Sequence, residues 1–132
     1  MIFPATTALF AGLFALLFVG LSAWVIGGRL TGNVLVGDGG QDALQRRIRS
    51  HGNFSEYVPM ALGLVALLEA SGTRHWIVVT LLVVLLVARL LHPVGMFAPV
   101  NSPRQFACRG GGIIATLLVT LVAAILLIVR AL

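Results

Sequence analysis

The sequence predicts an all-α integral membrane protein, a bundle of four transmembrane helices in a single domain, 1–132. Three observations lead to this prediction. Hydrophobic residues make up 59% of the 132 residues and charged residues only 10%, whereas charged residues make up about 25% of an average soluble protein. The longest uncharged runs reach the length that a helix needs to cross a bilayer, about 20 residues. Four such spans use most of the chain and leave no room for a separate soluble domain.

Each expected span has its own sequence pattern. The first is an uncharged run that ends at Gly-Gly-Arg, and the second begins with charges and becomes apolar from Tyr57 onward. The third is interrupted by Arg89, and the fourth is again uncharged. The glycines of the connection 37–40 suit turns that need a positive φ. Pro59 is expected to kink its helix beyond the charged start, and Pro93 is expected to end or kink its own helix. The four expected spans are 5–27, 42–71, 74–96 and 109–130.

The arginines predict how the chain lies in the membrane. Nine arginines and no lysine produce the net charge of +5. The expected loops 29–49 and 97–109 hold six of them, whereas the opposite side has only Arg74 and Arg130. Because basic loops remain in the cytoplasm, we expect both termini on the non-cytoplasmic side. We expect this basic chain to have the lipid bilayer as its partner and not nucleic acid.

A polar stripe runs along the start of the second span. Arg46, Arg49, Asn53 and Glu56 are spaced so that they share one face of a helix. Ionisable residues within a membrane normally face protein or water and often mark function. Two cations, an amide and a carboxylate match a small zwitterionic ligand. The competing interpretations are a solvated interfacial face and a structural ion pair between Glu56 and Arg89.

The segment 49–59, Arg-Ser-His-Gly-Asn-Phe-Ser-Glu-Tyr-Val-Pro, resembles the second-helix signature of the MAPEG family, the membrane-associated proteins of eicosanoid and glutathione metabolism. Weaker likenesses are Ala-Arg-Leu-Leu-His at 88–92, the start of the fourth span and the loop 37–40. Together they cover about the whole chain and are similar to small bacterial members. The resemblance implies a homotrimer of four-helix subunits in a bacterial inner membrane, which binds glutathione between neighbouring subunits near the cytoplasmic side.

The resemblance also implies a set of functional residues, with glutathione as co-substrate. Glu56 is expected to meet the amino group of the tripeptide. The reactive form of glutathione is the thiolate, and a nearby cation is needed because a free cysteine thiol has a pKa of about 8.5. The resemblance assigns this catalytic part to an arginine between the third and fourth spans, with Arg109 as first candidate and Arg104 as second. The expected glutathione-binding residues are Arg29, Arg49, Asn53, Glu56, Tyr57, Arg89 and His92.

The connection between the third and fourth spans carries two further expectations. The segment 97–108 is expected to be a loop, so that the glycines 110–112 lie at a helix N-terminus with N–H groups accessible to an anion, unless they serve close helix packing. Met96 stands where the eukaryotic synthases of the family carry a tyrosine, and Ile113 stands at a second position where a tyrosine is expected.

The expected function is that of a glutathione transferase or peroxidase acting on a lipophilic electrophile through an arginine-stabilised thiolate. A non-catalytic MAPEG-like membrane protein with a binding or structural role is the alternative, which the missing tyrosines favour. A small multidrug or proton antiporter is less favoured, because such exporters usually place the coupling carboxylate in the first helix, which here has no ionisable residue. A metal site is not expected, because the three histidines lack ligand spacing; they are His51, His75 and His92.

Overall fold

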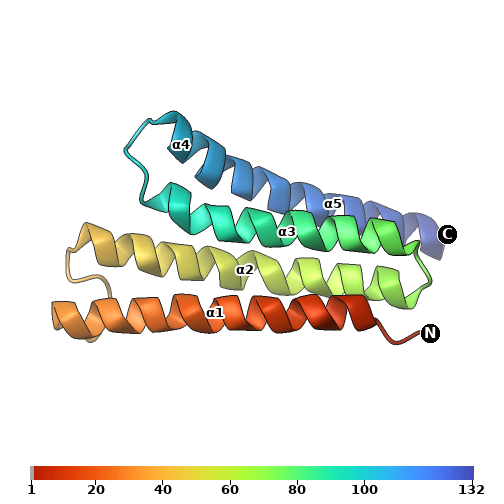
Figure 1. The fold of residues 1–132 in the computed structure, drawn as a ribbon, viewed down its shortest axis with the longest axis horizontal. Helices are drawn as coiled ribbons and strands as arrows, with labels where there is room; N and C mark the ends of the chain where they lie inside the picture. Colours follow the sequence, from red (N-terminus) through yellow and green to blue (C-terminus); the bar gives the residue numbers. More distant parts are fainter. Residues whose placement is uncertain (1) are drawn as a thin grey trace.

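The computed structural model describes residues 2–132, and over this range all the regular structure is helical. Four long helices run side by side (Figure 1). A short helix, α4, and a π-helical turn, η1, lead without a break into the last long helix. The predicted all-α four-helix bundle is thus confirmed. The elements are α1 (Ala5–Gly32), α2 (Asp42–Ala70), α3 (His75–Met96), α4 (Pro103–Gln105), η1 (Phe106–Gly110) and α5 (Gly111–Ala131).

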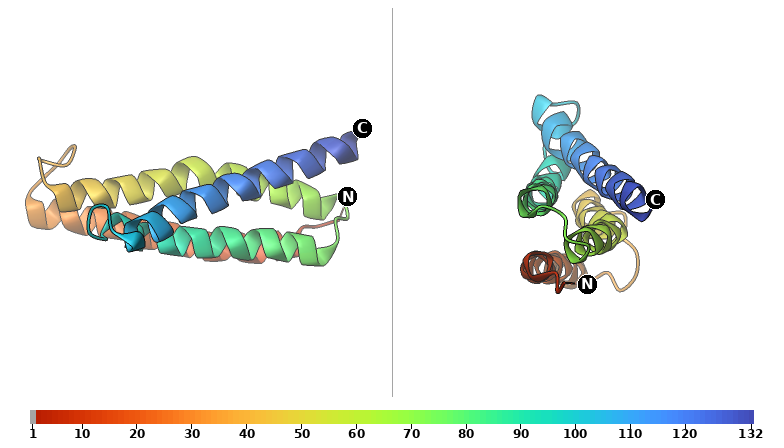
Figure 2. Two further views of the ribbon diagram at one scale, coloured as in Figure 1. Left: turned by 90° about the horizontal axis from the view of Figure 1, so that it is seen from above. Right: turned by 90° about the vertical axis from the view of Figure 1, so that its right-hand side faces the viewer.

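Within residues 2–132, three helical segments are long and apolar enough to cross a membrane, namely α1, α3 and the continuous segment from α4 to α5. The helix α2 has a comparable length but carries the polar stripe in its first half. It packs against each of the other three long helices, whereas α1 and α5 do not contact each other within the described residues. An end-on view shows α1 and α5 on opposite sides of the bundle (Figure 2).

The core lies where α2 and α3 meet their neighbours. Apolar residues of α2 recur at helical spacing and are almost fully buried, and α3 offers a matching row. Few residues of α1 and α5 are buried, and many of their large apolar side chains are exposed, as expected for surfaces that contact lipid or another protein in a membrane. The buried core comprises Phe14, Leu21, Phe54, Val58, Ala61, Val65, Leu68, Val78, Leu81, Leu82, Leu85, Val119 and Ala123.

The loops that carry most arginines lie at one end of the bundle, and both termini lie at the other (Figure 1). At the arginine-rich end, α1 stops at Asn33, whose φ of 53° is left-handed. The glycines Gly37, Gly39 and Gly40 all have positive φ, as the sequence predicted. The amide N–H of Gly40 donates to the Asp38 carboxylate at 2.9 Å, which stabilises the turn.

Two contacts at the opposite end join helices through backbone groups. The Glu69 carboxylate, near the end of α2, accepts hydrogen bonds from the amides of Thr6 and Thr7 at 2.9 and 2.7 Å, and from the Thr7 hydroxyl at 2.7 Å. It thereby caps the start of α1. The Arg130 guanidinium, near the end of α5, donates to the carbonyl of Ser71 at 2.6 Å, in the turn between α2 and α3.

The structure bears on two expectations about helix ends. Both prolines lie inside their helices, within the expected spans 42–71 and 74–96, since α2 continues through Pro59 and α3 continues through Pro93 to Met96. Membrane helices tolerate proline because neighbouring groups satisfy the carbonyls that it leaves free. The expected loop is also shorter, because helical structure begins at Pro103. The Ser102 hydroxyl accepts from the amide of Gln105 at 3.1 Å, and a cap of this kind before a proline starts a helix.

The earlier start of this helix changes the role of the glycines 110–112. They lie inside a continuous helical segment, so the expectation that they form a helix N-terminus open to an anion is wrong. The amide of Gly111, for example, bonds to the carbonyls of Phe106 and Cys108. A Cβ atom added to Gly112 would lie 2.9 Å from the carbonyl oxygen of Ala88. The packing interpretation therefore holds for Gly112.

Candidate functional site

A polar cavity of about 510 Å³ lies at the arginine-rich end of the bundle. The start of α2 forms one wall, and the end of α3, the following connection and the segment α4–η1 form the other. Three arginines and three amide side chains contribute to its lining, but no carboxylate does. The lining residues are Gln45, Arg46, Arg49, Met96, Val100, Asn101, Gln105 and Arg109.

Backbone contacts position the walls of this cavity. The Arg46 guanidinium donates to the carbonyl of Met96 at 2.9 Å, which joins α2 to the C-terminal end of α3. A cation is favourable there, because the last carbonyls of a helix are free and carry partial negative charge. Arg49 follows almost one turn later in α2, and Arg109 belongs to η1. Both are exposed in the single subunit.

The charge of the cavity is not balanced within the described chain. No carboxylate oxygen of residues 2–132 lies within 4.0 Å of an arginine nitrogen in this region. Three guanidinium groups around one hollow attract an anion, and each presents a planar fork of donors that fits a carboxylate in a bidentate manner. The amide side chains add donors and acceptors for a polar ligand.

Arg89 and His92 belong to α3 and lie inside the bundle, where each is only 2% exposed. One terminal nitrogen of Arg89 donates to the carbonyl of Gly112 in α5 at 2.8 Å. The Nε atom of Arg89 and the Nε2 atom of His92 are buried without a hydrogen-bond partner. Glu56 is exposed, and the ion pair between Glu56 and Arg89 that we considered is absent from the described structure. Arg89 is thus a buried cation held by a backbone carbonyl.

The other predicted glutathione-binding residues are dispersed in the described structure. The side-chain amide of Asn53 is largely buried and donates to the carbonyl of Arg49 in its own helix at 2.9 Å. Tyr57 is half-buried. Arg29 donates to the carbonyl of Leu35 at 3.1 Å and lies against the connection between α1 and α2 instead of the cavity.

The two predicted catalytic candidates differ in position. Arg109 lines the cavity, whereas Arg104, in α4, is exposed and does not. The structure therefore brings Arg49 and Arg109 together and leaves Arg104 outside.

Sequence reasoning omitted several lining residues from the site. Arg46 belonged to the predicted stripe but was not assigned a ligand. The amides Asn101 and Gln105 lie in the segment expected to be a loop, and the helix start Ser102-Pro103 was the signal that could have placed Gln105 on a wall. Gln45 had no distinguishing signal, since it is one exposed polar residue in a charged helix start.

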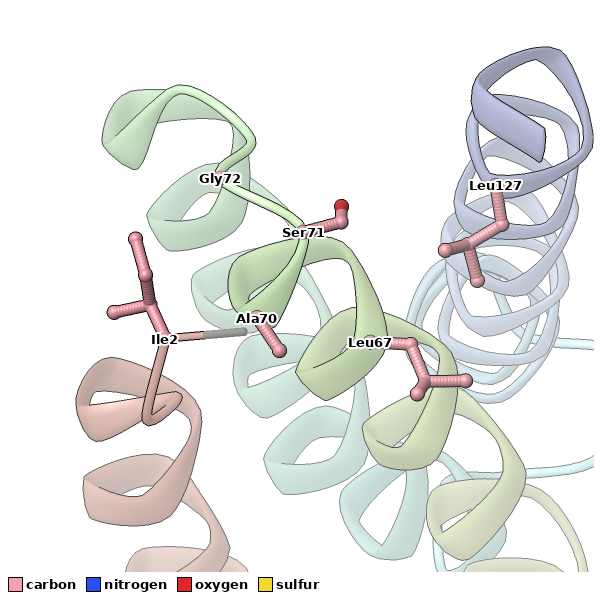
Figure 3. A pocket seen from close by; sticks show the side chains of 6 residues that line it. All are labelled: Ile2, Leu67, Ala70, Ser71, Gly72 and Leu127. Atoms are coloured by element: carbon pink, nitrogen blue, oxygen red, sulfur yellow. The ribbon is translucent and has the colours of Figure 1, made fainter.

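A second hollow, with a volume of about 570 Å³, lies at the other end, beside the termini (Figure 3). Its lining is mostly apolar and contains no ionisable side chain. The residues are Ile2, Leu67, Ala70, Ser71, Gly72 and Leu127. Recognition of a charged ligand is therefore favoured at the arginine-rich end.

The long apolar helices identify the chain as an integral membrane protein of the all-helical class. It carries a cationic cavity at one end of the bundle. A sequence model of the MAPEG family matches residues 7–129, so the chain belongs to the MAPEG family. The inner membrane proteins YecN of Escherichia coli strains K12 and CFT073 are each 40% identical to it over 110 residues, which is 83% of this chain and 80% of the relative. No solved structure matches it significantly.

Proposed function

We propose that this protein is a glutathione-binding membrane enzyme, a transferase or peroxidase that acts on a lipophilic electrophile. The observation that carries the proposal is the cavity in which Arg46, Arg49 and Arg109 meet without a carboxylate. It adjoins the second-helix motif through which the chain resembles glutathione-using members of its family. Glutathione suits this charge, because the tripeptide carries two carboxylates and one ammonium group near neutral pH.

In the proposed mechanism the arginines of α2 bind glutathione carboxylates through charge-assisted hydrogen bonds. Arg109 stabilises the thiolate, because a cation beside a thiol favours its ionised form. The thiolate then attacks the electrophile, so that a bond to sulfur forms while the electrophile loses its leaving group or takes up a proton. Positioning and electrostatic stabilisation supply the catalysis, and no bond to the protein forms. Arg104 lies outside the cavity and becomes the second choice.

We also propose that the functional unit is a homotrimer in the inner membrane, with the arginine-rich end in the cytoplasm. Arg29 and Glu56 do not line the cavity of their own chain, and in this proposal they reach the ligand from a neighbouring copy. The exposed apolar faces of α1 and α5 supply the surface for such contacts. The name of the Escherichia coli relative supports the choice of membrane.

A non-catalytic binding protein is the second candidate, and one observation favours it. Met96 lines the cavity, and no hydroxyl group does. A site of this kind holds an anionic tripeptide through arginines and amides but offers no hydroxyl donor to the sulfur.

The test is calorimetric titration of glutathione into the protein purified in detergent, followed by ultraviolet detection of the thiolate. We expect binding that the Arg49→Ala/Glu56→Ala variant abolishes, and a thiolate band near neutral pH that Arg109→Ala removes and Arg104→Ala retains. Binding without a thiolate band selects the non-catalytic protein. No binding by the unaltered protein overturns both forms of the proposal.

A further inference from the structure

We propose that Gly95 and the π-helical turn η1 form a positioning device that directs the side chain of Arg109 into the cationic cavity. This inference rests on the proposed function, since it explains how the arginine assigned to the thiolate obtains its position. Gly95 is a positioning residue and touches no ligand itself.

The first observation is the close approach of α3 to η1. Gly95 lies in the last turn of α3 and is buried. A Cβ atom added to it would lie 2.8 Å from both the Cα and the Cβ of Arg109, and closer still to the amide nitrogen of Arg109. These neighbours are mostly backbone atoms, which cannot swing aside as the end of a flexible side chain does. Only glycine fits at this point without displacing η1.

The second observation is the direction that this contact imposes on Arg109. Because the two backbones meet at Gly95, no space remains between the helices for a long side chain. The side chain of Arg109 must therefore leave the contact sideways, and it lines the cavity beside Met96, the neighbour of Gly95 in sequence. Gly95 thus fixes the position of the Arg109 backbone, and its neighbour Met96 forms part of the cavity wall beside the Arg109 side chain.

The third observation is the backbone conformation at Arg109. The residues Phe106–Gly110 form a π-helix between the α-helical segments α4 and α5. A π-turn accommodates one extra residue and so changes by about 100° the direction in which the residues before it point relative to those after it. Gln105 and Arg109 both line the cavity, while α5 directs Gly112 and Thr116 toward the bundle. The π-turn permits both orientations in one continuous helix.

The experiment is Gly95→Ala in the full-length protein, with Gly63→Ala as the matched control. Gly63 lies in α2, outside η1 and the cavity lining, and a Cβ atom on it meets nothing within 4 Å, so this control adds the same methyl group inside a helix without a collision. We measure the glutathione affinity by calorimetry, the ultraviolet thiolate band as a function of pH, and kcat and KM with a model lipophilic electrophile.

For Gly95→Ala we expect glutathione binding within about threefold of the unaltered protein, because Arg46 and Arg49 remain. The thiolate fraction at pH 7.5 should fall to that of free thiol, roughly one tenth for a pKa of about 8.5. The value of kcat should fall at least about tenfold, since a misplacement of about 1 Å can cost about a hundredfold. Gly63→Ala should retain the thiolate band and kcat.

The outcomes separate this inference from the proposed function. If the unaltered protein binds glutathione and shows a thiolate band that Gly95→Ala keeps at the same pH, the inference is wrong and the proposed function stands. If the unaltered protein shows no thiolate band, the proposed catalytic function is wrong, and the positioning role of Gly95 is rejected with it. If Gly95→Ala loses binding and thiolate together, Gly95 has a general structural role and the positioning role is rejected. Circular dichroism and size-exclusion chromatography establish that each variant is folded.

Discussion

Arg89 has an unusual environment for an arginine, because its side chain is only 2% exposed inside a membrane protein. Its only hydrogen-bond partner in the described chain is the carbonyl of Gly112, and its Nε atom has none. Removing an ion from water and leaving it without a counterion costs several kcal/mol. A hydrogen bond to one carbonyl does not offset this cost, so the retention of Arg89 points to function more than to stability.

We predict that Arg89→Met folds with an unfolding temperature equal to or above that of the unaltered protein. The apolar side chain of similar length removes the desolvation cost, and the Gly112 carbonyl keeps its bond from the Thr116 hydroxyl at 2.8 Å. Glutathione affinity should fall about tenfold, or about 1.4 kcal/mol, because the cavity loses a nearby positive charge. Thermal unfolding in detergent and calorimetry measure the two effects. A strongly destabilised variant would mean that Arg89 mainly joins α3 to α5.

At the scale of the elements, polar contacts join the helices at their ends, and glycines allow helices to approach each other closely. Glu69 of α2 caps the first turn of α1, where the free amides of a helix favour a negative charge. The contact is sequence-distant, and nothing in the local pattern of either helix predicts it. It stabilises the pairing of α1 with α2 at the end opposite to the cavity.

We predict that Glu69→Ala lowers the free energy of unfolding by about 1–3 kcal/mol, since two amides and one hydroxyl of α1 lose their acceptor. Denaturant unfolding of the purified protein in detergent measures the change. Glu56→Ala is the control, because that carboxylate is exposed and its removal should leave the stability unchanged. An equal loss in both variants would contradict the capping role. Glutathione binding should survive in Glu69→Ala, since the cavity lies at the other end of the bundle.

At the scale of the whole molecule, the two ends of the bundle differ in charge and in the chain segments that they contain. The cationic cavity and the arginine-rich connections lie at one end, and both termini lie at the other (Figure 1). In the function that we propose, the hydrophilic ligand approaches from the aqueous side at the arginine-rich end, and the lipophilic substrate approaches from the bilayer. This separation suits an enzyme that joins a peptide to a lipophilic molecule.

We predict that the arginine-rich end faces the cytoplasm. The background for this test is Cys108→Ser, which removes the native thiol. In it, Thr73→Cys should react in intact cells with a thiol reagent that does not cross the membrane, because the turn at Thr73 lies at the same end of the bundle as both termini. Val36→Cys lies at the opposite end and is 88% exposed, and it should react only after the membrane is permeabilised. The reverse labelling pattern would refute the proposed orientation.

Much of the architecture could be predicted from the sequence, because it depends on local composition and period. The helices α2 and α3 lie within one residue of the expected spans, and the positive φ values of the loop glycines were expected. The helical segment that contains α5 begins six residues earlier than expected, since a capped proline and a π-turn extend it. At the site, the predicted Arg49 and Arg109 share the cavity, whereas the place of Arg46 in it required the structure.

By itself, the sequence determined that this protein is helical, that it belongs in a membrane and that its arginines gather at one end. These properties follow from hydrophobicity and charge counted along the chain. Only the tertiary structure decided which arginines meet in one cavity and that Arg89 bonds to Gly112 instead of Glu56. Both depend on the rotation of each helix about its axis, where a shift of one residue turns a side chain by about 100°. That rotation is set by the close contacts at Gly95 and Gly112 and by the π-turn, which join segments distant in the sequence.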